Sequence, residues 1–305
     1  MRLSPALSVT LVGAAATFVG CSRSNAGAEP APQASTPPPP AAPAPTTPPN
    51  ALPMPSASVD AVVNPANLPP YDGPTGSVEG TVFVKGAESP DVPDLDFHAC
   101  PAALDTYRKL FRAGPPREDG QRPLADAVVV VTGYSGYYVP EKAPSQLVVI
   151  SATCAYLQRT LALTFGQRLD VLNDSKLSFA PYLQGSGDVT VMIAPPERHG
   201  EAVKIYPTRA AYFGLRDRLQ TFVHGDVLVL RHPLHAVTDL QGHFRIDGVP
   251  VGKLSVGAKL VPIQAEATKD VVVRANVVEN VDLVLTYAPK PPVPAARNAK
   301  RPQIW

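Results

Sequence analysis

The sequence predicts an all-β protein made of two β-sandwiches and one short helix, preceded by a Pro-rich tether. Residues 238–256 alternate apolar and polar side chains between two turns, which is the period of a half-buried strand. Residues 125–132, ADAVVVVT, form a β-branched run bounded by polar residues. Between these features, short apolar runs recur at the spacing typical of a further sandwich.

The composition separates a folded middle from two Pro-rich ends. The chain has 305 residues and a net charge of +1, so charge gives no argument for nucleic-acid binding. Hydrophobic residues make up 45% of the chain, which is enough for one or two cores. The 37 prolines gather near both ends.

Residues 1–20 are predicted to be a secretory signal peptide. Arg2 precedes an apolar run, Ala6–Val19, that is too short to span a bilayer. The following FVGC, ending at Cys21, resembles the lipobox of bacterial lipoproteins. This resemblance implies that Cys21 carries a lipid, and Ser22 next to it implies an outer-membrane anchor, facing the periplasm or the cell surface. The alternative is an ordinary signal peptide with an incidental cysteine.

Residues 21–75 are predicted to be a disordered tether. Pro, Ala, Ser and Thr dominate, with four prolines at 37–40, and such a composition cannot bury enough apolar surface to offset chain entropy. At about 3.1 Å per residue, about 50 residues can reach well over roughly 100 Å. The alternative is a ligand for a proline-recognition domain. The tail, 288–305, is also Pro-rich and expected to be disordered, with a docking peptide as the alternative.

The folded body is expected to begin with a strand at 76–86, GSVEGTVFVKG. Residues 95–112 carry apolar side chains at helical spacing and precede a Pro-Pro pair, so we expect one helix there, packed over a sheet edge. The run 125–132 is apolar on both faces, which favours a central strand.

The stretch 231–254 holds the most specific motif. Asp239 can bond its own backbone in a turn, Gly242 can take a positive φ, and Phe244 and Ile246 alternate with polar residues. The pattern T-D-x-x-G-x-F-x-I…V-P-x-G resembles the carboxypeptidase regulatory-like domain, a transthyretin-like β-sandwich. The resemblance implies a discontinuous sandwich, 76–139 with 231–287, in which the motif builds hairpins and does no catalysis.

Residues 140–230 are expected to form an inserted domain. The segment Cys154–Ser175 resembles the core of a cupredoxin, and the whole order resembles bacterial plastocyanin-like proteins of the methylamine-utilisation type. We expect strands at Gln146–Ser151, Tyr156–Phe165, Arg168–Leu172, Val189–Ile193, Ala202–Ile205 and Asp226–Leu230.

The cupredoxin resemblance implies a copper site of two imidazoles, a thiolate and a weak methionine ligand. The four matching positions hold Phe179, Asp217, Gln220 and Val223, and no cysteine lies between 155 and 305. Without a thiolate there is no blue-copper centre. We therefore expect a degenerate cupredoxin-like frame with no cofactor, whose emptied pocket is filled by apolar side chains.

Two cysteines besides Cys21 need an explanation. In an oxidising envelope, Cys100 and Cys154 are expected to form a disulfide; two buried free thiols are the alternative.

His224, His232 and His235 are the alternative metal site, with copper as the metal. On a strand, positions i and i+3 point to opposite faces, so structural or surface histidines are favoured. Tyr134, Tyr137 and Tyr138 can line a partner or glycan surface or, as we favour, close the seam between the sandwiches.

No G-x-S-x-G, H-E-x-x-H or phosphate-loop motif is present, so we expect no enzyme activity. The sequence predicts a lipid-anchored envelope protein that binds an unidentified periplasmic partner or has a structural role. The alternative is a metal-binding or electron-transfer protein of the periplasm.

Overall fold

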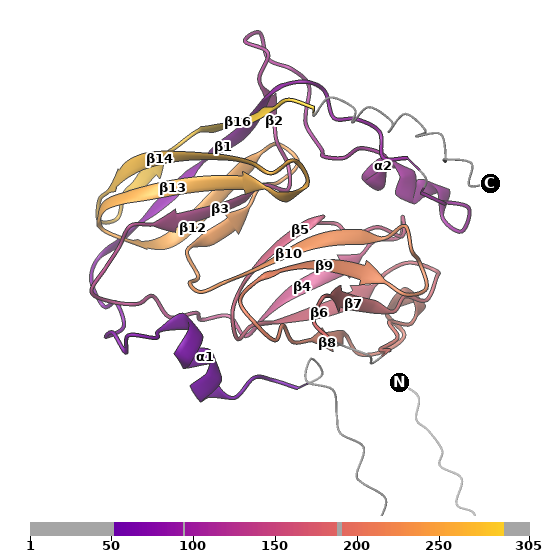
Figure 1. Cartoon of the computed structure of the whole chain (residues 1–305), viewed down its shortest axis with the longest axis horizontal. Helices are drawn as coiled ribbons and strands as arrows, with labels where there is room; N and C mark the ends of the chain where they lie inside the picture. Colours follow the sequence, from indigo (N-terminus) through magenta and orange to yellow (C-terminus); the bar gives the residue numbers. More distant parts are fainter. Residues whose placement is uncertain (1–51, 94, 188–190, 290–305) are drawn as a thin grey trace, which may run out of the picture. The chain divides into compact units, whose positions relative to one another are not determined.

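The computed structural model describes residues 52–93, 95–187 and 191–289 (Figure 1). The chain divides into two units, 1–45 and 46–305, and the described residues all lie in the second. They form strands in four sheets, with two short α-helices, α1 (Ser56–Val63) and α2 (Leu104–Tyr107). The predicted all-β sandwich class is confirmed.

The first sandwich pairs strands from both ends of the described chain. One sheet has the order β12-β1-β15, with β16 and β2 also paired to β1, and the other has the order β11-β3-β13-β14. Its buried side chains come from residues 78–131 and 234–285. The strands are β1 (Thr75–Gly86), β2 (Arg122–Pro123), β3 (Val128–Thr132), β11 (His235–Val237), β12 (His243–Pro250), β13 (Gly252–Leu260), β14 (Ala265–Val273), β15 (Val278–Asn280) and β16 (Leu283–Tyr287).

The second sandwich lies between β3 and β11 in the sequence. Its sheets have the orders β5-β10-β9-β7 and β4-β6-β8, and its core draws on residues 148–229 together with Ala103 and Tyr107. The strands are β4 (Ser145–Ile150), β5 (Thr160–Thr164), β6 (Arg168–Asn173), β7 (Pro181–Gln184), β8 (Val203–Ile205), β9 (Tyr212–Asp217) and β10 (His224–Leu230). The chain thus leaves the first sandwich after β3 and returns to it at β11.

The motif between β11 and β12 builds the turn that its residues predict. Asp239 Oδ1 accepts hydrogen bonds from the backbone N–H groups of Gln241 and His243. Gly242 has a φ of +79°, and a Cβ there would lie 2.6 Å from the carbonyl oxygen of Val82. Glycine is therefore required at this position by backbone angle and by close approach. Phe244 and Ile246 are buried on β12.

The predicted helix over 95–112 is much shorter in the structure. A 3₁₀ turn, Pro101–Ala103, leads into α2, which ends at Tyr107. Beyond α2 the backbone pairs with an earlier loop, since Leu110 N–H bonds to Pro90 O. The apolar side chains at helical spacing are buried in two different cores, Tyr107 in the second and Phe111 in the first, so they do not share one helix face.

The predicted tether, 21–75, overlaps structured chain at its end. Helix α1 lies within it, and Val59, Val62 and Val63 pack against the core of the second sandwich. A Cβ at Gly166 would lie 2.8 Å from a methyl carbon of Val59, which shows how closely α1 approaches β5 and β6. The remainder of the tether up to residue 51, and the tail from 290, lie outside the described residues.

The strand predictions for the second sandwich hold in part. Strands lie where 146–151, 168–172, 202–205 and 226–230 predict them, but β5 covers only the second half of 156–165. β7 and β9 were missed because Pro181 and Gly214 weaken their strand pattern. Of the predicted strand Val189–Ile193, the first two residues lie outside the described chain and the other three are not in a strand.

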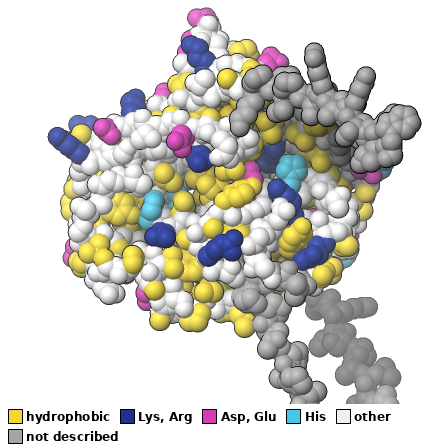
Figure 2. All heavy atoms as spheres, viewed as in Figure 1, with side chains coloured by type: hydrophobic (Ala, Val, Ile, Leu, Met, Phe, Trp, Pro, Cys, Tyr) yellow, Lys and Arg dark blue, Asp and Glu magenta, His cyan; other side chains and the backbone are white. Residues whose placement is uncertain are grey.

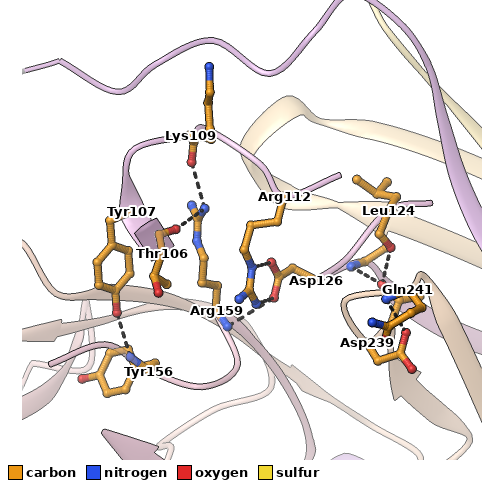
Figure 3. Close-up of polar contacts among 12 residues, drawn as sticks. Thr106, Tyr107, Lys109, Arg112, Leu124, Asp126, Tyr156, Arg159, Asp239 and Gln241 are labelled. Carbon is orange, nitrogen blue, oxygen red and sulfur yellow. Dashed lines mark hydrogen bonds and ion pairs between the residues drawn. The ribbon is translucent and has the colours of Figure 1, made fainter. Parts of the chain in front are cut away.

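A buried polar cluster joins the two sandwiches (Figure 3). Asp126, which is 6% exposed, accepts two hydrogen bonds from the Arg112 guanidinium, at 2.7 and 2.6 Å, and one from the Arg159 backbone N–H at 3.2 Å. The Arg159 side chain donates to the carbonyl oxygens of Thr106, Lys109 and Leu110. Residues 95–112, which we call the capping segment, are thereby held to both sandwiches.

We predict that Asp126→Asn lowers the free energy of unfolding by about 3 kcal/mol, because it removes the buried carboxylate that pairs with the largely covered Arg112 guanidinium. Asparagine tolerates the φ of +65° found at this position, so backbone strain is not the cause. Urea unfolding of the full chain measures the change. Asp247→Asn, in an exposed pair with Arg245, is the matched control and should cost less than about 1 kcal/mol. Equal losses in the two variants would contradict the role given to Asp126.

Candidate functional site

The four positions that the resemblance assigns to copper ligands lie together at one end of the second sandwich. Phe179, fully buried, precedes Ala180, whose backbone N–H donates to Asp217 Oδ2 at 2.7 Å. Asp217 ends β9 and begins the loop that carries Gln220 and Val223. The fold therefore brings the four positions together at this end of the second sandwich.

Asp217 acts as a cap for that loop. Its Oδ1 accepts the backbone N–H groups of Leu219 and Gln220, at 2.9 and 2.8 Å, while Oδ2 accepts the Ala180 N–H. Burial raises the pKa of the Asp217 carboxyl, and the three N–H donors oppose that shift. Both carboxylate oxygens are already engaged in holding the backbone.

Of the other positions, Gln220 bonds to the backbone and Val223 carries no ligand atom. Gln220 Nε2 donates to Ser178 O at 3.3 Å, and Val223 is fully buried. Phe222 packs its ring 5.4 Å from the ring of Phe97 in the capping segment. Apolar side chains thus pack beside these positions.

The capping segment closes this end of the second sandwich. Cys100 forms a disulfide with Cys154, so the sequence-predicted pair is bonded in the structure. Tyr107 is fully buried and its hydroxyl accepts the backbone N–H of Tyr156 at 2.9 Å (Figure 3). Its ring lies 4.6 Å from the ring of His224. Its pKa is raised to about 12 by burial. The capping segment therefore covers Phe222 and His224 at the end of the loop that follows β9.

The three histidines of the alternative metal site make separate contacts. His224 Nδ1 lies 3.0 Å from Phe222 O, and His235 Nε2 lies 3.2 Å from Thr164 Oγ1. His232 packs edge-on against Tyr134 at 6.1 Å. Within the described residues, no three His, Cys, Asp or Glu side chains are grouped so as to hold a metal ion.

Sequence reasoning missed the polar cluster that positions the site. Arg159 directly precedes the buried strand β5 and is 6% exposed, and Asp126 has a positive φ just before the β-branched strand β3. A charged residue directly beside an apolar strand is a signal that a buried partner exists. The Tyr156 hydroxyl was also missed: it is buried and has no hydrogen-bond partner in the described chain.

The predicted lipidation site, Cys21, lies outside the described residues, as does the predicted signal peptide. None of the helices in the described part of the chain has the length and apolar character needed to cross a bilayer. On the face shown in Figure 2, Lys and Arg side chains are scattered rather than gathered into one patch.

We predict that the protein loses stability as the pH falls from about 6.5 toward 4. Burial lowers the pKa of His224 and of His235 to about 4, from an ordinary value of 6.5. As the pH falls below about 6.5, these histidines take up protons in the unfolded chain but not yet in the folded one. Their contribution to the free energy of unfolding is therefore fully present above pH 6.5 and is lost between about pH 6.5 and 4. Each histidine contributes roughly 1–2 kcal/mol by pH 5. Urea unfolding between pH 7.5 and 5 measures the loss.

The double variant His224→Gln, His235→Gln isolates this effect. Asp217 and Asp226 act in the opposite direction, since burial raises their pKa. In the double variant the free energy of unfolding should therefore fall less as the pH is lowered, or should rise. His243→Gln, on an exposed turn, is the matched control. An unchanged pH dependence in the double variant would show that these histidines are not held neutral by burial.

Comparisons with known proteins give similar solved structures, among them amicyanins. No protein-family model matches the sequence, and no curated protein matches it. Among solved structures, amicyanin from Paracoccus versutus (Thiobacillus versutus) is 16% identical, with 29% of this chain and 84% of that chain covered and a TM-score of 0.25. A reduced amicyanin mutant is 17% identical, covering 33% and 97%, with a TM-score of 0.25. A Cu(I) amicyanin mutant is 18% identical, covering 28% and 82%, with a TM-score of 0.24.

Proposed function

We propose that the protein is a non-enzymatic lipoprotein of the cell envelope whose body is a binding or structural module. In this proposal residues 140–230 are a cupredoxin-like frame without its copper site, inserted into a regulatory-like sandwich, 76–139 with 231–287. One observation carries it. The position assigned to the copper thiolate holds Asp217, whose two oxygens are taken by three backbone N–H groups.

The surroundings of Asp217 support the same conclusion. Phe179 and Val223 supply no donor atom, and Gln220 is turned to a backbone carbonyl. Carboxylate and amide oxygens are poorly suited to a copper electron-transfer site, which uses thiolate and imidazole ligands. The capping segment is attached to this end of the second sandwich by the Phe97–Phe222 contact and by the disulfide. In this proposal the loop that follows Asp217 serves to hold the capping segment.

We predict that copper or zinc loading of the full chain, followed by desalting, leaves near-zero metal. About one metal per chain, abolished by His224→Ala or His232→Ala, would favour the metal-binding or electron-transfer alternative and contradict the proposal.

The matched variant is Phe179→His, Asp217→Cys, Gln220→His, Val223→Met, which restores the four ligand types. If the frame is cupredoxin-like, it should bind about one copper per chain and show thiolate-to-Cu(II) charge-transfer absorption. The same variant with Ser in place of the new Cys is its control and should lack that absorption. A folded four-residue variant that binds no copper would refute the cupredoxin-like frame.

The anchor is the second part of the proposal. Cys21 follows an apolar run and precedes a Pro-rich stretch, so a lipid there would place the body away from an envelope membrane, next to a periplasmic or cell-surface partner. We predict that metabolic labelling with a fatty acid marks the protein and that Cys21→Ala abolishes both the label and membrane association. A labelled Cys21→Ala variant, or one that stays on the membrane, would exclude this anchor.

A further inference from the structure

One covalent bond fastens the first part of the capping segment to the second sandwich. The disulfide joins Cys100, just before the 3₁₀ turn that leads into α2, to Cys154, in the turn between β4 and β5. Cys154 is 3% exposed, whereas Cys100 is only partly buried, and the neighbouring His98 and Pro101 line a hollow of about 490 Å³. An external thiol can therefore approach the bond from the side of Cys100.

Residues 95–100, which we call the latch, otherwise rest on the second sandwich by apolar packing. Leu95 and Phe97 pack against its core, and the ring of Phe97 lies 5.4 Å from that of Phe222. The hydrogen bonds of the latch within the described chain are local, as in the bond from the Cys100 N–H to Phe97 O at 2.9 Å. The disulfide is thus the covalent tie between the latch and the strands.

The rest of the capping segment has anchors that do not involve sulfur. The Arg159 side chain donates to three carbonyl oxygens between Thr106 and Leu110. The Arg112 guanidinium pairs with the buried Asp126 carboxylate. Because these bonds persist when the S–S bond is broken, residues 106–112 stay attached to both sandwiches.

The turn that carries Cys154 is also closed without the disulfide. The Ser151 N–H donates to Ala155 O at 2.8 Å, and the Cys154 N–H donates to Ser151 O at 2.9 Å. A buried free cysteine packs as a small apolar side chain. Breaking the S–S bond therefore leaves Cys154 in the core and loosens mainly the latch.

We propose that the disulfide is redox-controlled: its reduction by a dithiol protein frees the latch and uncovers Phe222, while residues 106–112 stay in place. The oxidised chain keeps Phe222 covered by Phe97, and the reduced chain presents both rings to an apolar partner surface. This control goes beyond the proposed function and does not depend on it.

The exchange follows the ordinary course of thiol–disulfide chemistry. A thiolate of the dithiol protein attacks Cys100 Sγ, the S–S bond breaks, and the electron pair leaves on Cys154 Sγ. The second thiolate of the dithiol then displaces Cys100 Sγ from the mixed disulfide. The dithiol becomes a disulfide, and the two protons that it gives up end on Cys100 and Cys154.

The first test is hydrogen exchange of the full chain, oxidised and then reduced with dithiothreitol in the absence of denaturant. The amides of Cys100 and Ala103 should exchange about ten-fold faster or more after reduction, since they belong to the latch and the turn after it. Those of Leu110 and Ala125 should be unchanged, because their hydrogen bonds involve the anchored part. Unchanged exchange at Cys100, or equal acceleration at all four amides, would overturn the proposal.

The second test asks whether the bond is reached in the folded protein. Reduction with dithiothreitol is followed over time by alkylation and mass spectrometry of the digested protein, which separates Cys100 and Cys154 from Cys21. The rate should change little with low concentrations of urea, since attack at Cys100 exposes little new surface. A rate that rises steeply with urea would mean that the bond is reached only by global unfolding, and would contradict the proposal.

The double variant Cys100→Ser, Cys154→Ser should show the fast exchange of the reduced chain with or without dithiothreitol. Cys21→Ser, which removes the cysteine outside the pair, is the matched control and should respond to dithiothreitol as the unaltered chain does. Slow exchange at residue 100 in a folded double variant would refute the latch. If the double variant does not fold, the two tests on the unaltered chain still decide.

Discussion

The carboxylate of Asp126 is the point on which the rest of the structure depends. It lies before β3 with a φ of +65°, and it binds the Arg112 guanidinium and the Arg159 backbone N–H. Arg112 belongs to the capping segment and Arg159 precedes β5, so one buried group joins the first sandwich, the cap and the second sandwich. Removing one partner would leave a charge buried and uncompensated, which is far more costly than losing an exposed ion pair.

The fixed cap explains the state of the neighbouring site. Arg159 holds the end of α2 through three carbonyl oxygens, and the disulfide holds its beginning. Between these two anchors, Phe97 and Tyr107 contact Phe222 and His224 of the loop that follows β9. Asp217 holds the same loop by accepting hydrogen bonds from the backbone N–H groups of Leu219 and Gln220. A loop held by backbone hydrogen bonds on one side and aromatic packing on the other is a structural element, which is why we assign the body a binding or structural role.

Much of the fold follows from local pattern. The β-branched run before Thr132, the Asp239–Gly242 turn and the alternation of Phe244 and Ile246 each dictate their structure locally, and the structure agrees. The clustering of Phe179 with Asp217 followed from a resemblance, because no local signal links residues on different strands. Prediction failed where tertiary contacts determine the local structure. The helix ends at Tyr107 because Phe111 packs in the core of the other sandwich. Helix α1 forms in the predicted tether because its valines pack against the core of the second sandwich. The pocket lined by Tyr134, Tyr137 and His232 forms only where the two chain crossings meet, so sequence spacing alone could not locate it.

Native-state hydrogen exchange tests the central claim most directly. The amides of Ala180, Leu219 and Gln220 donate to Asp217, and that of Tyr156 donates to Tyr107. If the capped loop is one structural unit with the second sandwich, these amides should exchange only through global unfolding, with the same free energy as core amides such as that of Val227. Exchange of the loop amides at a free energy several kcal/mol below that of Val227 would mean that the site opens in the native state, and would contradict the account of a closed frame.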